Sequence, residues 1–261
     1  MFLIEPLFDV LKNLGTANEI ILIAVIFASG GFTKGAIGFG LPTVAVPLLA
    51  NFMPVPIAIS ISLLAILLSN AYQAIFVGSP LQSMKRFWPL LLAVCVTLSV
   101  TTQLLVTLTA SSLLVFVGMI TVLLVGLQLT GYRLSVPTTH EKWTGVGIGI
   151  LSGIMGGITT LFSMPLIIFL TNLRLTKDEF INAISLLLFS GALVMTLLLA
   201  RYSVLTKTEF ILSVYALVPL TLGYVLGAKL RKALNPETFL RLVLIFLFCN
   251  GLWLVFKGLS S

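Results

Sequence analysis

A single lysine, Lys34, lies well inside a long apolar stretch of the 261-residue chain. A charged side chain at membrane depth is costly unless it faces a cavity or a partner. The acidic residues all lie near the ends of apolar segments, in connectors or in the N-terminal arm, so the sequence offers no buried carboxylate as that partner. An anionic ligand is therefore the natural counter-charge of Lys34. Alternatively, the ammonium group reaches a lipid headgroup at the membrane surface.

Two glycine-rich turns, one directly after Lys34 and one in the second half of the chain, could bind such an anion. Each precedes a short apolar helix, whose first N–H groups are unpaired and whose dipole is positive at that end. Hydroxyl groups beside the turns could cap these helices or contact the ligand. The alternative is that the glycines only allow close helix packing. The candidate residues are Gly38, Phe39, Gly40, Pro42 and Thr43 in the first turn and Gly156, Gly157, Thr159, Thr160 and Ser163 in the second.

Polar side chains in two other apolar segments could complete the site. Asn70 and Gln73 lie in the segment after the first turn, and Asn182 and Ser185 lie in the segment after the second. Each could line a substrate pathway or form a hydrogen bond between helices, which is the commoner role. We include Asn70 and Gln73 among the candidate substrate-binding residues.

The composition places these residues in a membrane protein. Apolar residues make up 59% of the chain and charged residues 9%, whereas about a quarter of the residues in soluble domains are charged. At about 20 residues per membrane span, the length allows roughly eight spans and no separate soluble catalytic domain. The net charge of +7 comes from basic residues scattered between apolar runs. This pattern is typical of membrane topology signals and not of nucleic-acid binding.

Eight apolar segments follow an N-terminal arm, which could form a short amphipathic helix in the membrane interface over residues 1–18. The arm carries no basic leader, so we expect it to be retained. Most of the segments have the length of one crossing, but the first and fifth are longer, and glycine and proline break each near its middle. The segments cover roughly residues 20–50, 55–77, 88–107, 111–130, 143–171, 179–200, 209–229 and 238–256.

The two broken segments are related, which indicates an internal duplication. Four positions recur 118 residues later: Gly31, Gly35, Gly38 and Pro47 match Gly149, Gly153, Gly156 and Pro165. At an offset of 125 residues, the Ala-Ile-Ser at 58–60 recurs at 183–185, and residues 126–129 match 251–254. The sequence therefore predicts two halves, residues 1–131 and 143–261, joined by a connector at 132–142. Each half contains a broken segment followed by three transmembrane helices.

The basic residues favour one topology for these halves. If every segment is a simple crossing, eight basic residues lie on one side of the membrane and six on the other. If both broken segments instead enter and leave on the same side, the count is ten against four. The positive-inside rule then places the connector 132–142 in the cytoplasm and both termini outside, and the halves become inverted repeats. Residues 20–37 are long enough to cross alone, which leaves the side of the N-terminus open.

Few other chemistries are available to the chain. Cys95 and Cys249 lie within apolar runs, where a thiol acts as a small hydrophobic group, and His140 lies in a connector. These residues cannot form a metal site together, and we expect no cofactor. The membrane segments contain no histidine and no acidic residue, which disfavours an intramembrane enzyme. Only Lys34 with a nearby Ser or Thr leaves that option open.

The glycine-rich segments resemble those of a known family. The run FTKGAIGFGLP at 32–42, followed by Pro47, resembles the first signature of the TauE/SafE sulfite exporter family, also called the TSUP family. The run at 153–157, followed by 164–166, resembles its second signature, although Ile158 and Thr159 stand where many members have further glycine. The resemblance extends over essentially the whole chain. It implies a multi-pass transporter of the bacterial inner membrane.

This resemblance also implies a small sulfur-containing anion as the substrate, such as sulfite, thiosulfate or an organosulfonate. Together with the residues, it predicts a secondary transporter, working as an exporter, that binds the anion near the membrane midplane between two glycine-rich helix breaks. Its partners would be that anion and membrane lipid, with no nucleic acid. An anion channel of the same fold is one alternative, and an intramembrane enzyme is another.

Overall fold

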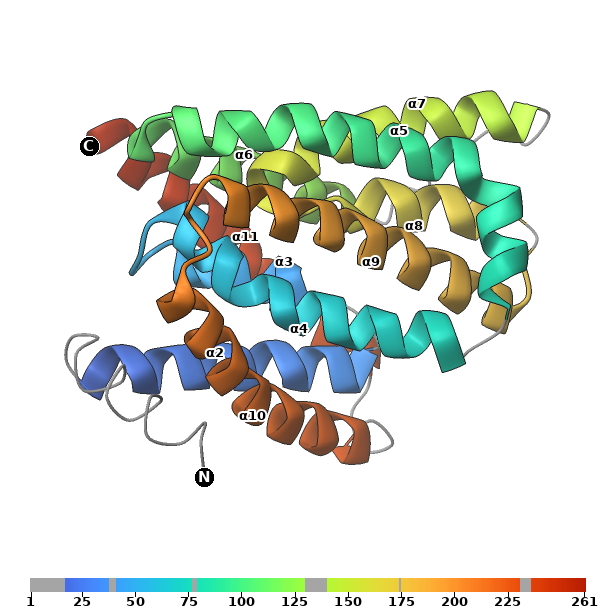
Figure 1. Ribbon diagram of the computed structural model, residues 1–261. Coiled ribbons are helices and arrows are strands. Elements are labelled where there is room, and N and C mark those ends of the chain that lie inside the picture. Colours follow the sequence, from blue (N-terminus) through green and yellow to red (C-terminus); the bar gives the residue numbers. More distant parts are fainter. Residues whose placement is uncertain (1–16, 38–40, 77–78, 130–139, 174, 231–235) are drawn as a thin grey trace.

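The computed structural model describes residues 17–37, 41–76, 79–129, 140–173, 175–230 and 236–261, and within these ranges the chain is helical with no β-strand (Figure 1). Seven of the described helices, namely α2, α4, α5, α6, α9, α10 and α11, are long and apolar enough to cross a membrane. The all-helical membrane fold predicted from the sequence is thereby confirmed. In chain order the helices are α2 (Ala17–Ile37), α3 (Leu41–Leu49), α4 (Val55–Phe76), α5 (Pro80–Thr107), α6 (Ala110–Leu129), α7 (Glu141–Thr159), α8 (Ser163–Asn172), α9 (Lys177–Arg201), α10 (Lys207–Leu230) and α11 (Pro236–Ser260).

Each of the two broken segments consists of two helices, as the glycines and prolines predict. The first gives α2 and α3, and the second gives α7 and α8. α2 is long enough to cross a membrane, whereas α8 has only 10 residues. Three parts of the sequence-based expectations lie outside the described residues: positions 1–16 of the expected interfacial helix 1–18, the turn residues Gly38, Phe39 and Gly40, and positions 132–139 of the connector.

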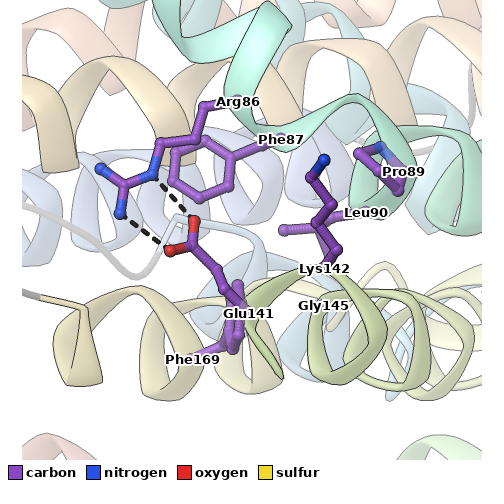
Figure 2. Close-up of a pocket in the computed structure, with 8 residues that line it drawn as sticks. All are labelled: Arg86, Phe87, Pro89, Leu90, Glu141, Lys142, Gly145 and Phe169. Atoms are coloured by element: carbon purple, nitrogen blue, oxygen red, sulfur yellow. Dashed lines mark hydrogen bonds and ion pairs between the residues drawn. The ribbon is translucent and has the colours of Figure 1, made fainter. Parts of the chain in front are cut away.

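The second broken segment is a hairpin that begins and ends at one end of the bundle. A side chain at Gly145, near the start of α7, would touch Phe169 near the end of α8. Arg86, near the start of α5, holds the start of α7 through two hydrogen bonds to the carboxylate of Glu141, at 2.8 and 3.0 Å (Figure 2). Arg86 also interacts electrostatically with Glu179, at the start of α9. We call the end at which α5, α7 and α9 begin the mouth end.

We call the opposite end, at which α4, α6 and α10 begin and α11 ends, the far end. Gly258 of α11 lies against Ser111 of α6, so these helices run antiparallel. The ammonium group of Lys257 donates to the carbonyl oxygen of Asn51, in the connection from α3 to α4, at 2.7 Å. Figure 1 shows the end of α11 and the beginning of α2 at this same end of the bundle.

Glycines bring a broken segment of each half against a helix of the other half. α2 packs along α10, and α7 packs along α5. A Cβ at the glycine of each contact would overlap with atoms of the facing helix, so only glycine permits helices this close together. The contacts are Gly223 with Ala28, Gly227 with Phe32, Gly153 with Thr97, and Gly157 with Thr101. Residue numbers rise together in both seams, so each pair of helices runs parallel.

α5 differs from the sequence-based expectation at its start. The apolar pattern predicts a helix over 88–107, but α5 begins at Pro80 and bends at Phe87, whose backbone angles are not helical (φ −104°, ψ 16°). Pro89 explains the bend, because proline has no N–H to donate and its ring clashes with the preceding turn. The additional residues before the bend include Arg86, and they place its side chain beside Glu141 (Figure 2).

We expect Gly223→Ala to destabilise the protein and Gly147→Ala to leave its stability unchanged. A Cβ at Gly223 would overlap with the carbonyl oxygen of Ala28, whereas a Cβ at Gly147 meets no atom within 4 Å. Overpacking costs about 1–3 kcal/mol, and each kcal/mol lowers Tm by roughly 2–4 °C in a chain of this size. Thermal unfolding in detergent measures the difference. Equal Tm values for the two variants would show that the α2–α10 seam is not closely packed.

Candidate functional site

A cavity of about 560 Å³ lies between the two halves. Its volume falls within the range of about 300–1,000 Å³ that is usual for small-molecule sites. A second cavity, beside Arg86 and Glu141 (Figure 2), measures about 10 Å³ and has room for roughly one water molecule. The large cavity is therefore the candidate site. Its polar lining residues are Lys34, Ser69, Asn70, Gln73, Thr160, Ser163, Thr171, Lys177, Ser185 and Tyr224.

Lys34 is the buried charge of this cavity. It lies near the C-terminal end of α2, is 9% exposed and lines the cavity wall. Within the described part of the chain, its ammonium group forms no hydrogen bond and no ion pair. The carbonyl end of the α2 dipole offsets part of its charge. No Asp or Glu occurs among the described lining residues, while Lys177 adds a second, exposed cation. The electrostatic character of the cavity is therefore positive.

Both short helices begin at the cavity. Leu41 and Pro42, the first two residues of α3, line it, and so do Phe162 and Ser163 at the start of α8. The residue that caps α8, Phe162, provides no side-chain hydrogen bond to the first N–H groups. Unpaired N–H groups and the positive ends of two helix dipoles therefore face the same space. Such an arrangement favours a negatively charged ligand.

The turn between α7 and α8 is held in an unusual conformation. Thr160 has a φ of 62°, in the left-handed region, which is strained for a β-branched residue. Its hydroxyl donates to the carbonyl oxygen of Thr159 at 2.5 Å. The hydroxyl of Thr159 donates to the carbonyl oxygen of Met155 at 2.6 Å and accepts from the N–H of Leu161 at 3.1 Å. These bonds fix the turn at the inner end of the cavity.

Polar contacts between α4 and α9 cross from one half to the other beside the cavity. The hydroxyl of Ser185 donates to Oε1 of Gln73 at 3.2 Å. Nδ2 of Asn182 donates to the carbonyl oxygen of Ala74 at 2.8 Å. On the α4 side, Nδ2 of Asn70 donates to the carbonyl oxygen of Ile66 at 2.7 Å. The amide groups of Asn70 and Gln73 thus belong to the wall where the halves meet.

The structure brings six of the candidate residues from the sequence into the cavity wall, and these are Lys34, Pro42, Asn70, Gln73, Thr160 and Ser163. Thr43, Gly156, Gly157 and Thr159 are buried but do not line it. A side chain at Gly156 would overlap with Phe162, and one at Gly157 would overlap with Thr101. Close packing, the alternative considered for these glycines, therefore accounts for their position.

Several lining residues were not among the sequence candidates. Lys177 stands at a segment end, where a basic residue is usually solvated, yet it begins α9 directly after the short α8 and so lies at the mouth. The short length of α8 is the signal that could have placed it there. Ser185 lines the cavity and also donates a hydrogen bond to Gln73 of α4, so the interhelical role considered for it occurs, while a role in a substrate pathway stays a prediction.

The lining supplies donors and positive charge, and this suits binding of an anion. Within the described residues, no group of three or more His, Cys, Asp or Glu side chains could hold a metal ion. Hydroxyl groups, amides, helix N-termini and ammonium groups are the polar groups that remain. Charge-assisted hydrogen bonds from such donors are stronger than neutral ones, so a small oxyanion could be held without a metal.

Comparison with known proteins agrees with this chemistry. No curated protein and no solved protein structure matches the chain significantly. A sequence model of the family described as "Sulfite exporter TauE/SafE" matches residues 22–254, which include every residue that lines the cavity. The chain therefore belongs to the TauE/SafE sulfite exporter family of membrane transporters.

Proposed function

We propose that the protein is a secondary transporter that exports a small sulfur-containing anion, such as sulfite, thiosulfate or an organosulfonate, across the bacterial inner membrane. Membership of a sulfite exporter family supports the sulfur-containing substrate. The observation that carries the proposal is Lys34, an ammonium group that is 9% exposed and has no ion-pair partner among the described residues, in the wall of a cavity without acidic lining residues.

The anion is held where the two halves meet. Lys34 supplies the counter-charge, and the start of α8 supplies unpaired N–H groups and the Ser163 hydroxyl. Asn70 and Gln73 add amide groups from α4. We expect Gly38, Phe39 and Gly40 to complete the site at the start of α3. Because the described residues of this site include no acid–base pair, we also propose that the protein is not an enzyme.

The distribution of basic residues supports an orientation. Of the described basic residues other than Lys34, six lie at the mouth end and three at the far end. The positive-inside rule then makes the mouth end cytoplasmic and puts the C-terminus outside. The cavity accordingly faces the cytoplasm, where an exporter binds its substrate. The mouth-end cations are Lys85, Arg86, Lys142, Lys177, Lys229 and Arg241, and the far-end cations are Arg201, Lys207 and Lys257.

Burial at the far end favours a transporter over a channel. Leu63 of α4, which precedes the cavity-lining Ile66 by one turn, is 1% exposed, so the cavity wall ends in a packed core. A transporter gives saturable flux, and unlabelled anion inside vesicles accelerates uptake of labelled anion. Flux that rises linearly with concentration and shows no such counterflow would assign the protein to the channels. Proteoliposomes loaded with thiosulfate and supplied with radiolabelled thiosulfate distinguish the two.

Replacement of Lys34 should weaken anion binding more than replacement of any other lysine. A hydrogen bond to a charged group contributes about 1.5–3 kcal/mol, so Lys34→Ala should weaken apparent affinity roughly ten- to hundredfold, and Lys34→Arg should retain part of it. Lys85→Ala is the matched control, because Lys85 is exposed and does not line the cavity. Thiosulfate and sulfite uptake into proteoliposomes measures the effect. Undiminished uptake by Lys34→Ala, in a variant that inserts normally, would remove Lys34 from the site.

An acidic residue at the start of α8 should block transport without unfolding the protein. A carboxylate at a helix N-terminus is favourable for the helix, but Ser163→Asp would place a fixed negative charge in the cavity wall. Ser163→Asn has nearly the same size without the charge and should keep measurable uptake. The comparison requires equal Tm values for the two variants in detergent. Equal uptake by both would show that the anion does not approach the start of α8.

A further inference from the structure

A duplicated sequence motif lies in two different environments in the two halves. In the second half, Ile184, Ser185 and Leu188 of α9 line the cavity, and the Ser185 hydroxyl donates to Oε1 of Gln73. The same residue types recur 125 positions earlier in α4, as Ile59, Ser60 and Leu63. The motif that contacts the cavity in one half is therefore also present in the other.

The first copy is enclosed by protein. Ile59 and Ser60 are 0% exposed and Leu63 is 1% exposed. Oγ of Ser60 has no hydrogen-bond partner, although the carbonyl oxygen of Ser60 accepts from the hydroxyl of Ser213 at 3.3 Å. A buried hydroxyl without a partner is unfavourable and requires an explanation. Because Ser60 lies near the beginning of α4, this group is at the far end, away from the mouth of the cavity.

Ser152 occupies the position in the second half that matches Lys34 in the first half. The two residues are 118 positions apart, the offset that relates the two broken segments. Lys34 lines the cavity, whereas Ser152 is 0% exposed and its Oγ has no hydrogen-bond partner. Pro42 and Thr160 are also 118 positions apart, and both line the cavity. Both members of the second pair thus line the cavity, whereas only one member of the first pair does.

We propose that Ile59, Ser60, Leu63 and Ser152 line a second half-pathway for the transported anion, which is closed in this structure and opens at the far end of the bundle. The inference rests on the proposed transporter function. When the halves exchange environments, the first copy of the motif takes the accessible position that the second copy holds here. The unpaired hydroxyls of Ser60 and Ser152 then gain water or the anion as partners.

The two half-pathways differ in charge. At the position where the mouth-end cavity has the ammonium group of Lys34, the far-end half-pathway has the hydroxyl of Ser152. A neutral hydroxyl binds an oxyanion less strongly than an ammonium group does. The protein therefore binds the anion more tightly when it faces the mouth end than when it faces the far end, and the far end is suited to release.

Accessibility of single cysteines to a membrane-impermeant maleimide tests the proposal. The background is the cysteine-free protein, with Cys95 and Cys249 changed to Ala, in vesicles that are also assayed for thiosulfate transport. Ser261→Cys, at the exposed C-terminus, marks the side that the far end faces. Matched pairs with identical residue types are then compared: Ile59→Cys with Ile184→Cys, Ser60→Cys with Ser185→Cys, and Leu63→Cys with Leu188→Cys. Ser152→Cys is tested in the same way.

The cysteines at positions 59, 60, 63 and 152 should react at least tenfold faster from the side of Ser261→Cys than from the other side. Those at positions 184, 185 and 188 should show the reverse preference. Ala58→Cys is the control, because the matching Ala183 does not line the cavity, and it should remain unreactive. If one serine variant fails to fold, Ile59→Cys and Leu63→Cys report on the same face of α4.

Failure of this inference is distinguishable from failure of the proposed function. Vesicles that transport thiosulfate while positions 59, 60, 63 and 152 stay unreactive from the side of Ser261→Cys would overturn the second half-pathway and leave the transport function standing. Faster reaction of these cysteines from the mouth side would also overturn it. Labelling with the expected sidedness in vesicles that move no sulfur-containing anion would support the half-pathway and reject the proposed substrate.

Discussion

A helix that ends inside a lipid bilayer leaves backbone N–H and C=O groups that lipid cannot satisfy, and the arrangement of this protein follows from that constraint. α3 and α8 both begin within the protein, where Leu41 and Phe162 are each 1% exposed. The first residues of both helices line one cavity. Water or an anion in this cavity could serve as the partner of the unpaired N–H groups at these helix starts. The other long helices, α4, α5, α6, α9, α10 and α11, form the enclosure that the two broken segments need.

Glycines determine how closely the helices pack in two seams. In the seam between α2 and α10, Gly223 and Gly227 face backbone atoms of α2, whereas in the seam between α5 and α7 the glycines face the side chains of Thr97 and Thr101. A side chain in place of any of these glycines would overlap with the facing helix. Each seam joins a broken segment to a helix of the other half. Between α4 and α9, hydrogen bonds run from Ser185 to Gln73 and from Asn182 to the carbonyl oxygen of Ala74.

Much of this architecture could be predicted from residue patterns, because membrane spans, helix breaks and a buried lysine are properties of single segments. Lys34, Pro42, Thr160 and Ser163 were identified as candidates because each lies at or beside a glycine-broken turn. Lys177 was not among the candidates, because only the short length of α8, which returns the chain to the mouth end, indicates its proximity to the cavity. Gly156 and Gly157 show another limit: glycine serves close packing and ligand approach equally well, and only the neighbouring Phe162 and Thr101 distinguish the two.

The lack of acidic side chains among the described lining residues bears on the energy source of transport. An anion that crosses such a pathway without a proton or a metal cation carries its full charge across the membrane. The membrane potential, negative inside, then drives it outwards with about 2.3 kcal/mol per charge for every 100 mV. For a monovalent anion this corresponds to roughly a fortyfold concentration ratio at equilibrium. If the protein exports a monovalent anion as proposed, and the anion crosses alone, the membrane potential would be sufficient to drive its exit without ATP.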